Sequence, residues 1–388
     1  MNKVIPLFKV FMSEDVDKPL LETLHSGFIG EGPKVLEFEE TLKKYLQTEN
    51  VLTTNSGTSA LHLAYHIALN SENYKTYATN YTPYDYWDVL TTPVTCTATN
   101  NPIIHNNSSI SWVDVDPITG NITPDTLRNA IVRELIHEHP LQSRAVSVVH
   151  WGGNPCDIEE IAKTCKEYNL KLIEDGAHSL GLEYNNKPFG YYSDFAIHSF
   201  QAIKHITCGD GGCLICKSKE DYERAKLLRW YGIDRTVREG IDLRCELDIP
   251  EAGYKFHMND LAATIGNENF KHFNEILNKH RENAKYYDQM FKGKVKFVPE
   301  NPNGKSAYWL YTIHVENRDE LMQKLKEEGI MSSKVHSRND THSMFEWFKE
   351  ELPGVDSFTR THLCIPVGWW VTEEDREFIA KKVLEYAK

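Results

Sequence analysis

Strand-like apolar runs alternate with amphipathic helical segments over about the first two-thirds of the chain. Residues 50–69 have the pattern of a strand, a short Asn-Ser-Gly-Thr turn and a helix, and residues 145–169 repeat that order. Further strand patterns occupy 170–175, 194–200 and 211–217. Such alternation predicts a mostly parallel sheet, because the crossovers between parallel strands pass through helices that then cover the sheet. We therefore expect an α/β fold with helices on both faces of the sheet.

The pattern changes after about residue 250, where long helical segments and a few short strands take over. The expected elements are a helical stretch at 258–291, a strand at 306–315, and helices at 318–329 and 372–387. This mixture is typical of a smaller α+β domain. We therefore expect a large domain over residues 1–250 and a small C-terminal domain over residues 251–388.

The charge and hydropathy of the chain exclude several classes of protein. The formal net charge of -13 argues against nucleic acid as the main partner, because phosphate would be repelled. No apolar run approaches the roughly 20 residues of a membrane span, and the N-terminal residues lack the apolar core of a signal peptide. Eight cysteines without an export signal favour reduced thiols and a cytoplasmic protein.

Three cysteines have the C-x4-C-x2-C spacing of a plant-type iron–sulfur loop. They are Cys208, Cys213 and Cys216, with Cys245 downstream. In a strand, however, Cys213 and Cys216 would face opposite sides of the sheet, which is poor geometry for one cluster. The pair His137 and His139 is a single H-x-H, which is weak evidence for a metal. We expect no metal site.

The turn Asn55-Ser56-Gly57-Thr58 ends one strand and opens a helix. A helix N-terminus offers free backbone N–H groups and a positive dipole end to an anion, and Ser and Thr add hydroxyl donors. The same residues would also serve as an ordinary helix cap. The turn is thus either a phosphate site or a cap.

Asp175 stands at the C-terminal end of a predicted buried strand, where open α/β sheets place ligand groups. A buried carboxylate needs a partner, and the protonated ring nitrogen of a cofactor is one candidate. The alternative is another helix-capping aspartate.

Lys204 follows the strand 194–200 and precedes the glycine-rich stretch Gly209-Asp210-Gly211-Gly212. A lysine that attacks an aldehyde works best when its pKa is lowered by desolvation or by a neighbouring cation. Glycines let the backbone pass close to a flat ligand. Together with the turn and Asp175, Lys204 supplies what a protein contributes to pyridoxal phosphate (PLP) chemistry: a phosphate site, an acid for the ring nitrogen and a lysine for a Schiff base.

Several segments in the same order also resemble the DegT/StrS family of sugar aminotransferases. They are HSGFIGEGPKVLEFEETLKKYL, NSGTSALHLA, EDGAHSLG, SFQAIKHITCGDGGCLIC and GYKFHMNDLAATIG. The resemblance covers nearly the whole chain and implies the aspartate-aminotransferase fold, which is PLP-dependent fold type I. It also implies a homodimer with shared active sites.

The resemblance assigns roles to six residues. By that resemblance Gly57, Thr58 and Ser199 would hold the cofactor phosphate. Asp175 would hold the pyridine nitrogen, His178 would approach the ring hydroxyl, and Lys204 would form the Schiff base and carry protons.

The sequence departs from the family pattern at two of the positions expected to bind cofactor. Cys96 stands where most members have an aromatic residue on the cofactor ring, and a thiol covers less area. Either Cys96 or another residue covers the ring. Lys255 replaces an asparagine that usually enters the neighbouring subunit's phosphate site, and His257 replaces an arginine. Lysine can still meet phosphate, as a point charge.

Two further segments bear on the substrate. His336 and Arg338 lie where the family has a substrate-facing loop, and such groups bind phosphate or carboxylate. The aromatic stretch 70–87 is longer than the family norm, and we expect it to pack rather than to shape the pocket.

The resemblance implies transfer of an amino group from an amino acid, glutamate by family habit, to a keto sugar. The sugar would be nucleotide-linked and destined for a surface polysaccharide or glycoconjugate. A phosphorylated ketone stays open as the substrate. The alternatives are a PLP-dependent dehydratase, although members of that kind carry histidine at the lysine position, and a binding protein that keeps the fold without activity.

Overall fold

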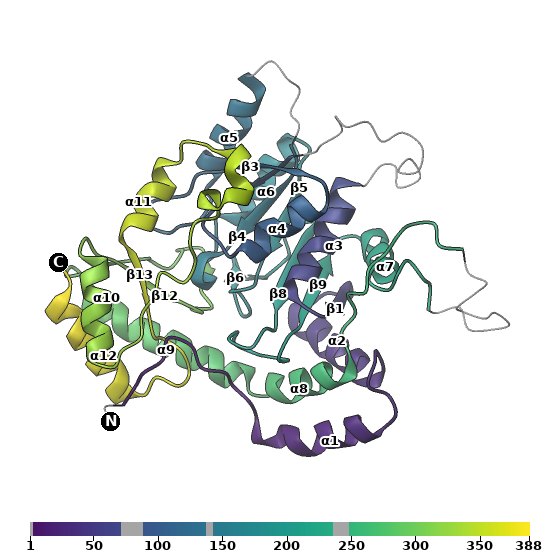
Figure 1. The fold of residues 1–388 in the computed structure, drawn as a ribbon, viewed down its shortest axis with the longest axis horizontal. Helices are drawn as coiled ribbons and strands as arrows, with labels where there is room; N and C mark the ends of the chain where they lie inside the picture. Colours follow the sequence, from purple (N-terminus) through teal and green to yellow (C-terminus); the bar gives the residue numbers. More distant parts are fainter. Residues whose placement is uncertain (1–2, 71–87, 137–142, 236–247) are drawn as a thin grey trace.

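The computed structural model describes residues 3–70, 88–136, 143–235 and 248–388. A seven-stranded sheet runs through the centre of the large domain (Figure 1). Its strands, in spatial order, are β1 (Val51–Thr54), β9 (Gly212–Cys216), β8 (Phe195–Ser199), β5 (Lys171–Asp175), β4 (Ser143–Val149), β2 (Asp88–Thr91) and β3 (Ser109–Trp112). All neighbours are parallel except β9, which is antiparallel to both β1 and β8. The predicted mostly parallel sheet is confirmed.

Helices flank this sheet and supply its crossovers (Figure 1). They are α2 (Pro33–Leu46), α3 (Gly57–Leu69), α4 (Thr97–His105), α5 (Pro124–Ile136), α6 (Ile158–Glu167) and α7 (Lys219–Leu228), with α1 (Asp17–His25) at the N-terminal side. The face of α2 that carries Phe38, Leu42 and Leu46 is buried, as the helical spacing predicts.

Strand β9 is fully buried, and its side chains alternate between two apolar cores. Cys213 and Ile215 pack in one core with Phe38, whereas Leu214 and Cys216 pack in the other. The alternation follows from the two-residue period of a strand. It places Cys213 and Cys216 on opposite faces of the sheet, as predicted.

The C-terminal region forms a second layer around a three-stranded antiparallel sheet of order β10–β12–β13. Its elements are α8 (Asp260–Phe270), α9 (Phe273–Phe291), β10 (Lys296–Phe297), β12 (Tyr311–His314), α10 (Arg318–Glu327), α11 (Pro353–Thr361), β13 (His362–Ile365) and α12 (Glu373–Tyr386). A third small sheet joins β11 (Gly304–Lys305), β6 (Glu183–Tyr184) and β7 (Lys187–Pro188).

The packing of the two regions crosses the expected boundary in both directions. Ala263 of α8 shares a core with Val35 and Phe38 of α2. Ile5 joins the C-terminal core and pairs with Ile330, so both ends of the chain lie beside the small domain (Figure 1). The division at residue 250 stays a prediction.

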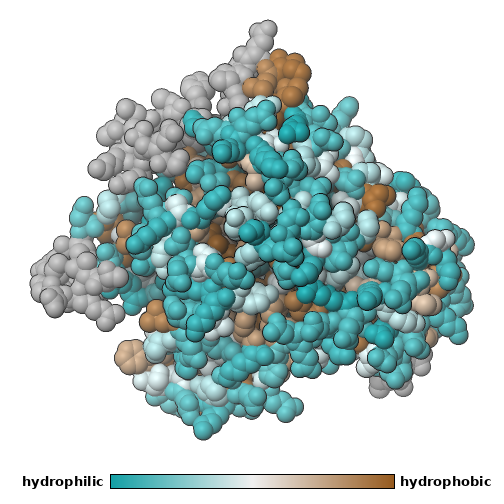
Figure 2. All heavy atoms as spheres, turned by 180° about the vertical axis from the view of Figure 1, so that it is seen from behind, coloured by the Kyte–Doolittle hydropathy of each residue, from teal (hydrophilic) through white to brown (hydrophobic). Residues whose placement is uncertain are grey.

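The helical stretch predicted at 258–291 is two helices, because the chain turns at Lys271 and His272 between α8 and α9. The face turned away in Figure 1 is mainly hydrophilic, with separate apolar groups (Figure 2). Within the described ranges, no helix has both the length and the apolar character needed to cross a membrane.

Candidate active site

The tip of α3 lies against the ends of β8 and β9. Ser56 caps the helix, since its Oγ accepts a hydrogen bond from the Ser59 N–H at 3.0 Å. A Cβ added to Gly57 would lie 3.0 Å from the Ser199 Cβ, and one added to Gly212 would lie 2.5 Å from the Gly57 nitrogen. Glycine therefore lets the helix tip and both strands meet. The first N–H groups of a helix have no intrahelical acceptor, so this tip suits an anion.

Asp175 ends β5 and is only 4% exposed. Its Oδ2 accepts a hydrogen bond from the Thr99 hydroxyl at 2.7 Å, and its Oδ1 accepts one from the Ala177 N–H at 3.0 Å. Burial raises the pKa of this carboxyl, whereas the two hydrogen bonds and the Lys204 charge oppose the rise. A cationic ring nitrogen beside Asp175 would favour the ionised carboxylate.

Lys204 lies in the turn after β8 and is partly buried. Its amine sits 3.8 Å from the centre of the Trp309 ring. Burial lowers the pKa of Lys204 to about 8, while the Asp175 and Cys96 side chains act in the opposite direction. A lysine of this kind is a free amine in roughly one molecule in ten at pH 7, which is the form that attacks a carbonyl.

Two imidazoles complete this edge of the sheet. His178 stacks on Trp309 with ring centres 4.0 Å apart, and His336 lies parallel to His178 at 5.6 Å. Burial lowers the pKa of both rings, that of His336 to about 4. The buried His178 Nδ1 and His336 Nε2 have no hydrogen-bond partner within the described structure, so two neutral imidazoles offer open nitrogens to a ligand.

These observations fit pyridoxal phosphate. The α3 tip suits its phosphate, buried Asp175 suits a cationic ring nitrogen, and the amine of Lys204 suits its aldehyde. The orphaned nitrogen of His178 is available to a polar ring substituent. The individual cofactor-binding roles of these residues stay predictions.

The other predicted cofactor residues surround this arrangement. Thr58 is exposed on the first turn of α3, and Ser199 is partly buried at the end of β8. Cys96 occupies the N-cap position of α4 without a side-chain capping bond, is half-buried, and lies near enough to Lys204 to affect its pKa. Lys255 is exposed, with its amine 3.9 Å from the Trp230 ring centre and its carbonyl accepting from the Asn55 amide at 3.2 Å. Its reach into a second subunit stays a prediction.

The two predicted substrate residues behave differently. His336 lies in the site, whereas the Arg338 guanidinium is held by two carboxylates of its own chain. It donates to Asp340 at 2.6 Å and also pairs with Asp356. These acids raise the pKa of Arg338 further. A substrate would have to compete with both carboxylates for Arg338, so that role stays a prediction.

Sequence reasoning missed Trp309 and Thr99. Trp309 belongs to the segment predicted as a strand at 306–315, but the strand begins only at Tyr311. Its indole N–H donates to the Ile203 carbonyl, 106 positions away in the chain. Thr99 lies in the TCTAT segment, three residues after Cys96, where a hydroxyl beside a predicted ligand position was the only available signal.

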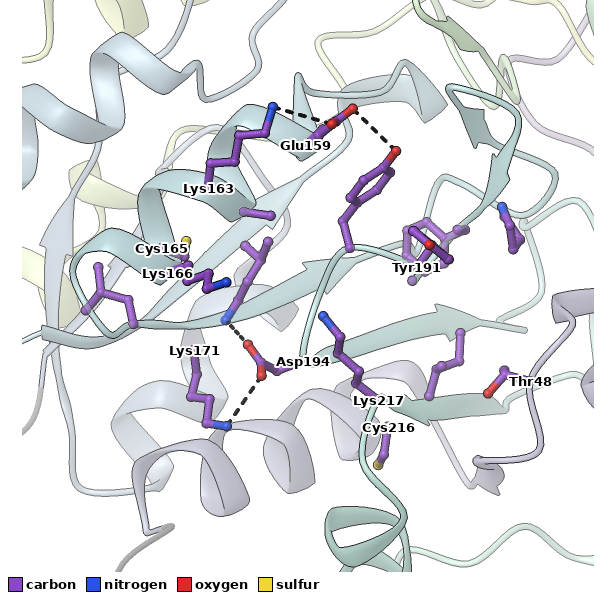
Figure 3. Close-up of a pocket in the computed structure, with 18 of the residues that line it drawn as sticks. Thr48, Glu159, Lys163, Cys165, Lys166, Lys171, Tyr191, Asp194, Cys216 and Lys217 are labelled. Atoms are coloured by element: carbon purple, nitrogen blue, oxygen red, sulfur yellow. Dashed lines mark hydrogen bonds and ion pairs between the residues drawn. The ribbon is translucent and has the colours of Figure 1, made fainter.

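A cavity of about 790 Å³ opens at the opposite edge of the sheet, by the amino ends of β5 and β8 (Figure 3). Its charged groups are largely paired with one another. Lys171 contacts Asp194 at 3.4 Å, and Lys163 contacts Glu159 at 3.4 Å (Figure 3). Lys204 and Asp175 do not line this cavity, so the candidate active site is elsewhere.

No group of three or more metal-ligating side chains occurs among the residues that the structure describes. Burial raises the pKa of Cys208 and of Cys213, to about 12 in the latter. Cys245, His137, His139 and the aromatic stretch after Asn70 lie outside the described residues.

Comparison with known proteins identifies the family. A model of the DegT/DnrJ/EryC1/StrS aminotransferase family matches residues 11–384. The UDP-4-amino-4,6-dideoxy-N-acetyl-beta-L-altrosamine transaminase of Campylobacter jejuni is 31% identical over 377 residues, which cover 94% of this chain and 92% of the relative.

Solved structures of similar proteins support the same family. AtS13 from Actinomadura melliaura is 37% identical, with a TM-score of 0.88 and 98% of each chain covered. The sugar aminotransferase CalS13 from Micromonospora echinospora is 34% identical, also with a TM-score of 0.88, and the match covers 98% of this chain and 99% of that one. The chain therefore belongs to the DegT/DnrJ/EryC1/StrS family and is a pyridoxal-phosphate-dependent aminotransferase of fold type I.

Proposed function

We propose that this aminotransferase moves an amino group from L-glutamate to the keto carbon of a nucleotide-linked sugar. The product would be an amino sugar for a surface polysaccharide or glycoconjugate. The observation that carries the proposal is the convergence of Lys204, Asp175 and the α3 tip at one edge of the sheet, where β5 pairs with β8, Asp175 acts on Lys204 and Gly57 approaches Ser199. That edge is where open α/β sheets bind ligands.

Pyridoxal phosphate, when bound, supplies the electron sink that lets an amino acid lose its α-proton. The chain's own groups do the rest. The Lys204 Nζ, as a free amine, takes the α-proton of the donor and later delivers a proton to the acceptor carbon. Asp175 keeps a negative charge facing the ring nitrogen, and its geometry is fixed by Thr99 and Ala177. The buried, neutral imidazoles of His178 and His336 orient polar groups without adding charge.

The substrate class rests on likeness to relatives with named sugars. One is the UDP-linked altrosamine transaminase of Campylobacter jejuni. Another is the dTDP-4-dehydro-2,3,6-trideoxy-D-glucose 4-aminotransferase of Saccharopolyspora spinosa, 29% identical over 334 residues. Both names specify a nucleotide and an amino group, present or transferred, at position 4 of the sugar. We therefore place the acceptor carbonyl at position 4 of a nucleotide-linked sugar.

In this proposal the active enzyme is a homodimer with shared active sites. It is located in the cytoplasm. Lys255 is an exposed residue whose backbone carbonyl accepts a hydrogen bond from Asn55. Its amine is the group that would reach the second subunit's phosphate site. The seven cysteines of the described residues are free thiols, which suits a reducing compartment.

The test is a screen of acceptors with glutamate as donor, read by release of 2-oxoglutarate. The acceptors are UDP- and dTDP-linked 4-keto sugars, the matching 3-keto sugars and simple keto phosphates. We expect turnover with a nucleotide-linked 4-keto sugar. Turnover only with a keto phosphate, or sugar conversion that proceeds without an amino donor as in a dehydratase, would overturn the proposal.

A further inference from the structure

The indole of Trp309 lies against the reactive lysine. The Lys204 Nζ is 3.8 Å from the centre of a Trp309 ring, well within the distance of a cation–π contact. We propose that Trp309 is a positioning residue that holds the Lys204 amine in place whenever that amine is not bonded to the cofactor. The proposal rests on Lys204 being the reactive lysine of the aminotransferase, and it does not depend on which sugar is the acceptor.

The ring takes the place that a carboxylate usually has beside a buried ammonium. Among the described residues, no Asp or Glu oxygen makes an ion pair with the Lys204 amine. Asp175 is the acidic group that acts on it electrostatically, but each Asp175 oxygen already accepts a hydrogen bond, one from Thr99 and one from Ala177. The negative face of the indole is therefore the direct contact that favours the ammonium form.

The indole is itself held in a fixed orientation. Its N–H donates to the carbonyl of Ile203 at 3.0 Å, so the ring is tied to the residue directly before Lys204. His178 stacks on it at 4.0 Å with an interplanar angle of 18°, and Phe8 stacks on it at 4.9 Å and 23°. The residue before it, Tyr308, has a φ of 46°, a conformation that persists in a non-glycine residue only where the surroundings impose it.

Two opposing effects thus act on the Lys204 amine. Burial favours the neutral amine and lowers its pKa, whereas the ring face favours the ammonium and limits the fall. Without the ring the amine would lose its proton at lower pH, but it would also lose the surface that fixes its position. A misplaced base removes a proton slowly even when it is uncharged, because proton transfer requires correct geometry.

The direct test is chemical labelling of Lys204 in the full-length chain freed of cofactor. Acetic anhydride reacts with the neutral amine, and peptide mass spectrometry follows Lys204 across a pH series. We expect a midpoint near pH 8 for the wild type. Trp309→Leu should lower that midpoint by about one pH unit, which is a tenfold change and the size expected of one partly desolvated cation–π contact.

Three variants serve as matched comparisons. Trp309→Phe keeps an aromatic face and loses the indole N–H. Its labelling midpoint should therefore lie closer to that of the wild type than to that of Trp309→Leu. Trp309→Met introduces about the volume of leucine in a longer and more flexible side chain without an aromatic face, and it replaces Trp309→Leu if that chain does not fold. Trp112→Phe changes a buried tryptophan on β3 that makes no contact with Lys204, and it should leave the midpoint unchanged.

The loaded enzyme gives a second readout. For Trp309→Leu we expect kcat to fall about tenfold or more with little change in the KM for glutamate, because positioning rather than donor binding is lost. An unchanged labelling midpoint in Trp309→Leu, or in Trp309→Met where that variant replaces it, would overturn the inference, as would an equal shift in Trp112→Phe. The labelling uses no keto substrate, so failure of the acceptor screen would leave its outcome intact.

Discussion

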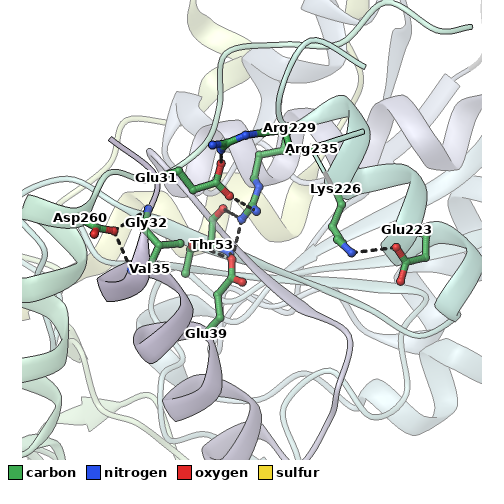
Figure 4. A network of polar contacts seen from close by, with 10 residues as sticks. All are labelled: Glu31, Gly32, Val35, Glu39, Thr53, Glu223, Lys226, Arg229, Arg235 and Asp260. Atoms are coloured by element: carbon green, nitrogen blue, oxygen red, sulfur yellow. Dashed lines mark hydrogen bonds and ion pairs between the residues drawn. The ribbon is translucent and has the colours of Figure 1, made fainter. Parts of the chain in front are cut away.

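The buried polar groups around Arg229 and those around Lys204 differ in how far the chain itself supplies their partners. Around Arg229, which is 7% exposed, the chain supplies a partner for each terminal nitrogen (Figure 4). Nη1 donates to Glu39 at 2.6 Å and to the Thr53 carbonyl at 2.8 Å, and Nη2 donates to Glu31 at 2.6 Å. Glu39 in turn accepts from the Thr53 N–H at 2.8 Å.

The same region contains a second closed arrangement. Asp260, at the start of α8, accepts from the N–H groups of Gly32, Lys34 and Val35, and so satisfies the N-terminus of α2 (Figure 4). Both arrangements tie the N-terminal segment to elements more than 180 positions away. Apart from the Arg229 Nε, which has no partner within the described residues, these polar groups are paired in contacts that hold the fold together.

At the carboxyl edge of the sheet, around Lys204, several buried polar groups lack a hydrogen-bond or ion-pair partner in the part of the chain that the structure describes. Lys204 rests on an aromatic ring, and the His178 Nδ1 and His336 Nε2 have no partner within the described residues. Burying polar groups without partners is costly, and the grouping of these two nitrogens beside Lys204 indicates a place where a ligand completes the structure. The terminal nitrogens of Arg229 are all paired, whereas the active-site edge groups two unpaired, uncharged imidazole nitrogens beside a lysine that has no ion-pair partner in the described residues. Burial of charge alone therefore does not distinguish an active site.

The largest effect is expected from Lys204→Ala. Transamination should fall by about a thousandfold or more, because the covalent partner and the proton carrier are both lost. The thermal unfolding midpoint should not fall, because burial of the Lys204 amine costs free energy and the variant removes that cost. Near-normal turnover in the variant, measured as 2-oxoglutarate release, would show that the open cluster is not the active site.

Arg229→Met tests the closed cluster. It leaves Glu39 buried without its ion-pair partner, and we expect a loss of about 3 kcal/mol in the free energy of unfolding. Denaturant titration measures the loss, and Lys226→Met is the control because Lys226 forms an exposed pair with Glu223 (Figure 4). A loss in Arg229→Met no larger than in the control would contradict the structural role of the cluster.

Asp175→Asn keeps the shape of the side chain and removes its charge. We expect kcat to fall about a hundredfold, because the electrostatic support of the ring nitrogen is lost while Thr99 still has an oxygen to donate to. The absorbance spectrum of the loaded enzyme should change with it, since the ring nitrogen would no longer be held protonated. A spectrum and a kcat like those of the wild type would remove Asp175 from its predicted role.

A smaller effect is expected from pH. The Lys204 pKa is lowered to about 8, so the amine is mostly protonated below that pH and mostly free above it. The donor half-reaction, followed by rapid mixing at saturating glutamate, should therefore speed up about tenfold per unit as pH rises toward 8 and level off above it. A rate that is flat between pH 6 and 8 would mean that the free amine of Lys204 does not limit this step.

The features of this protein that depend on local pattern could be predicted from the amino-acid sequence. The strand and helix periods predict the parallel sheet, the turn at Gly57 with its capping serine, and Asp175 at a strand end. Each follows from residues that are close together in the chain, so backbone geometry is enough to place them. The order of motifs added the resemblance to the family.

Contacts between side chains that are distant in the sequence became visible only in the folded chain. Trp309 beneath Lys204, Thr99 beside Asp175, and Ile5 in the C-terminal core all come from segments whose own patterns do not reveal a partner. The same holds for Arg338, whose cationic side chain predicts an anion but not that Asp340 and Asp356 supply it. Such contacts depend on how whole elements pack, and packing is a property of the assembled core rather than of any one segment.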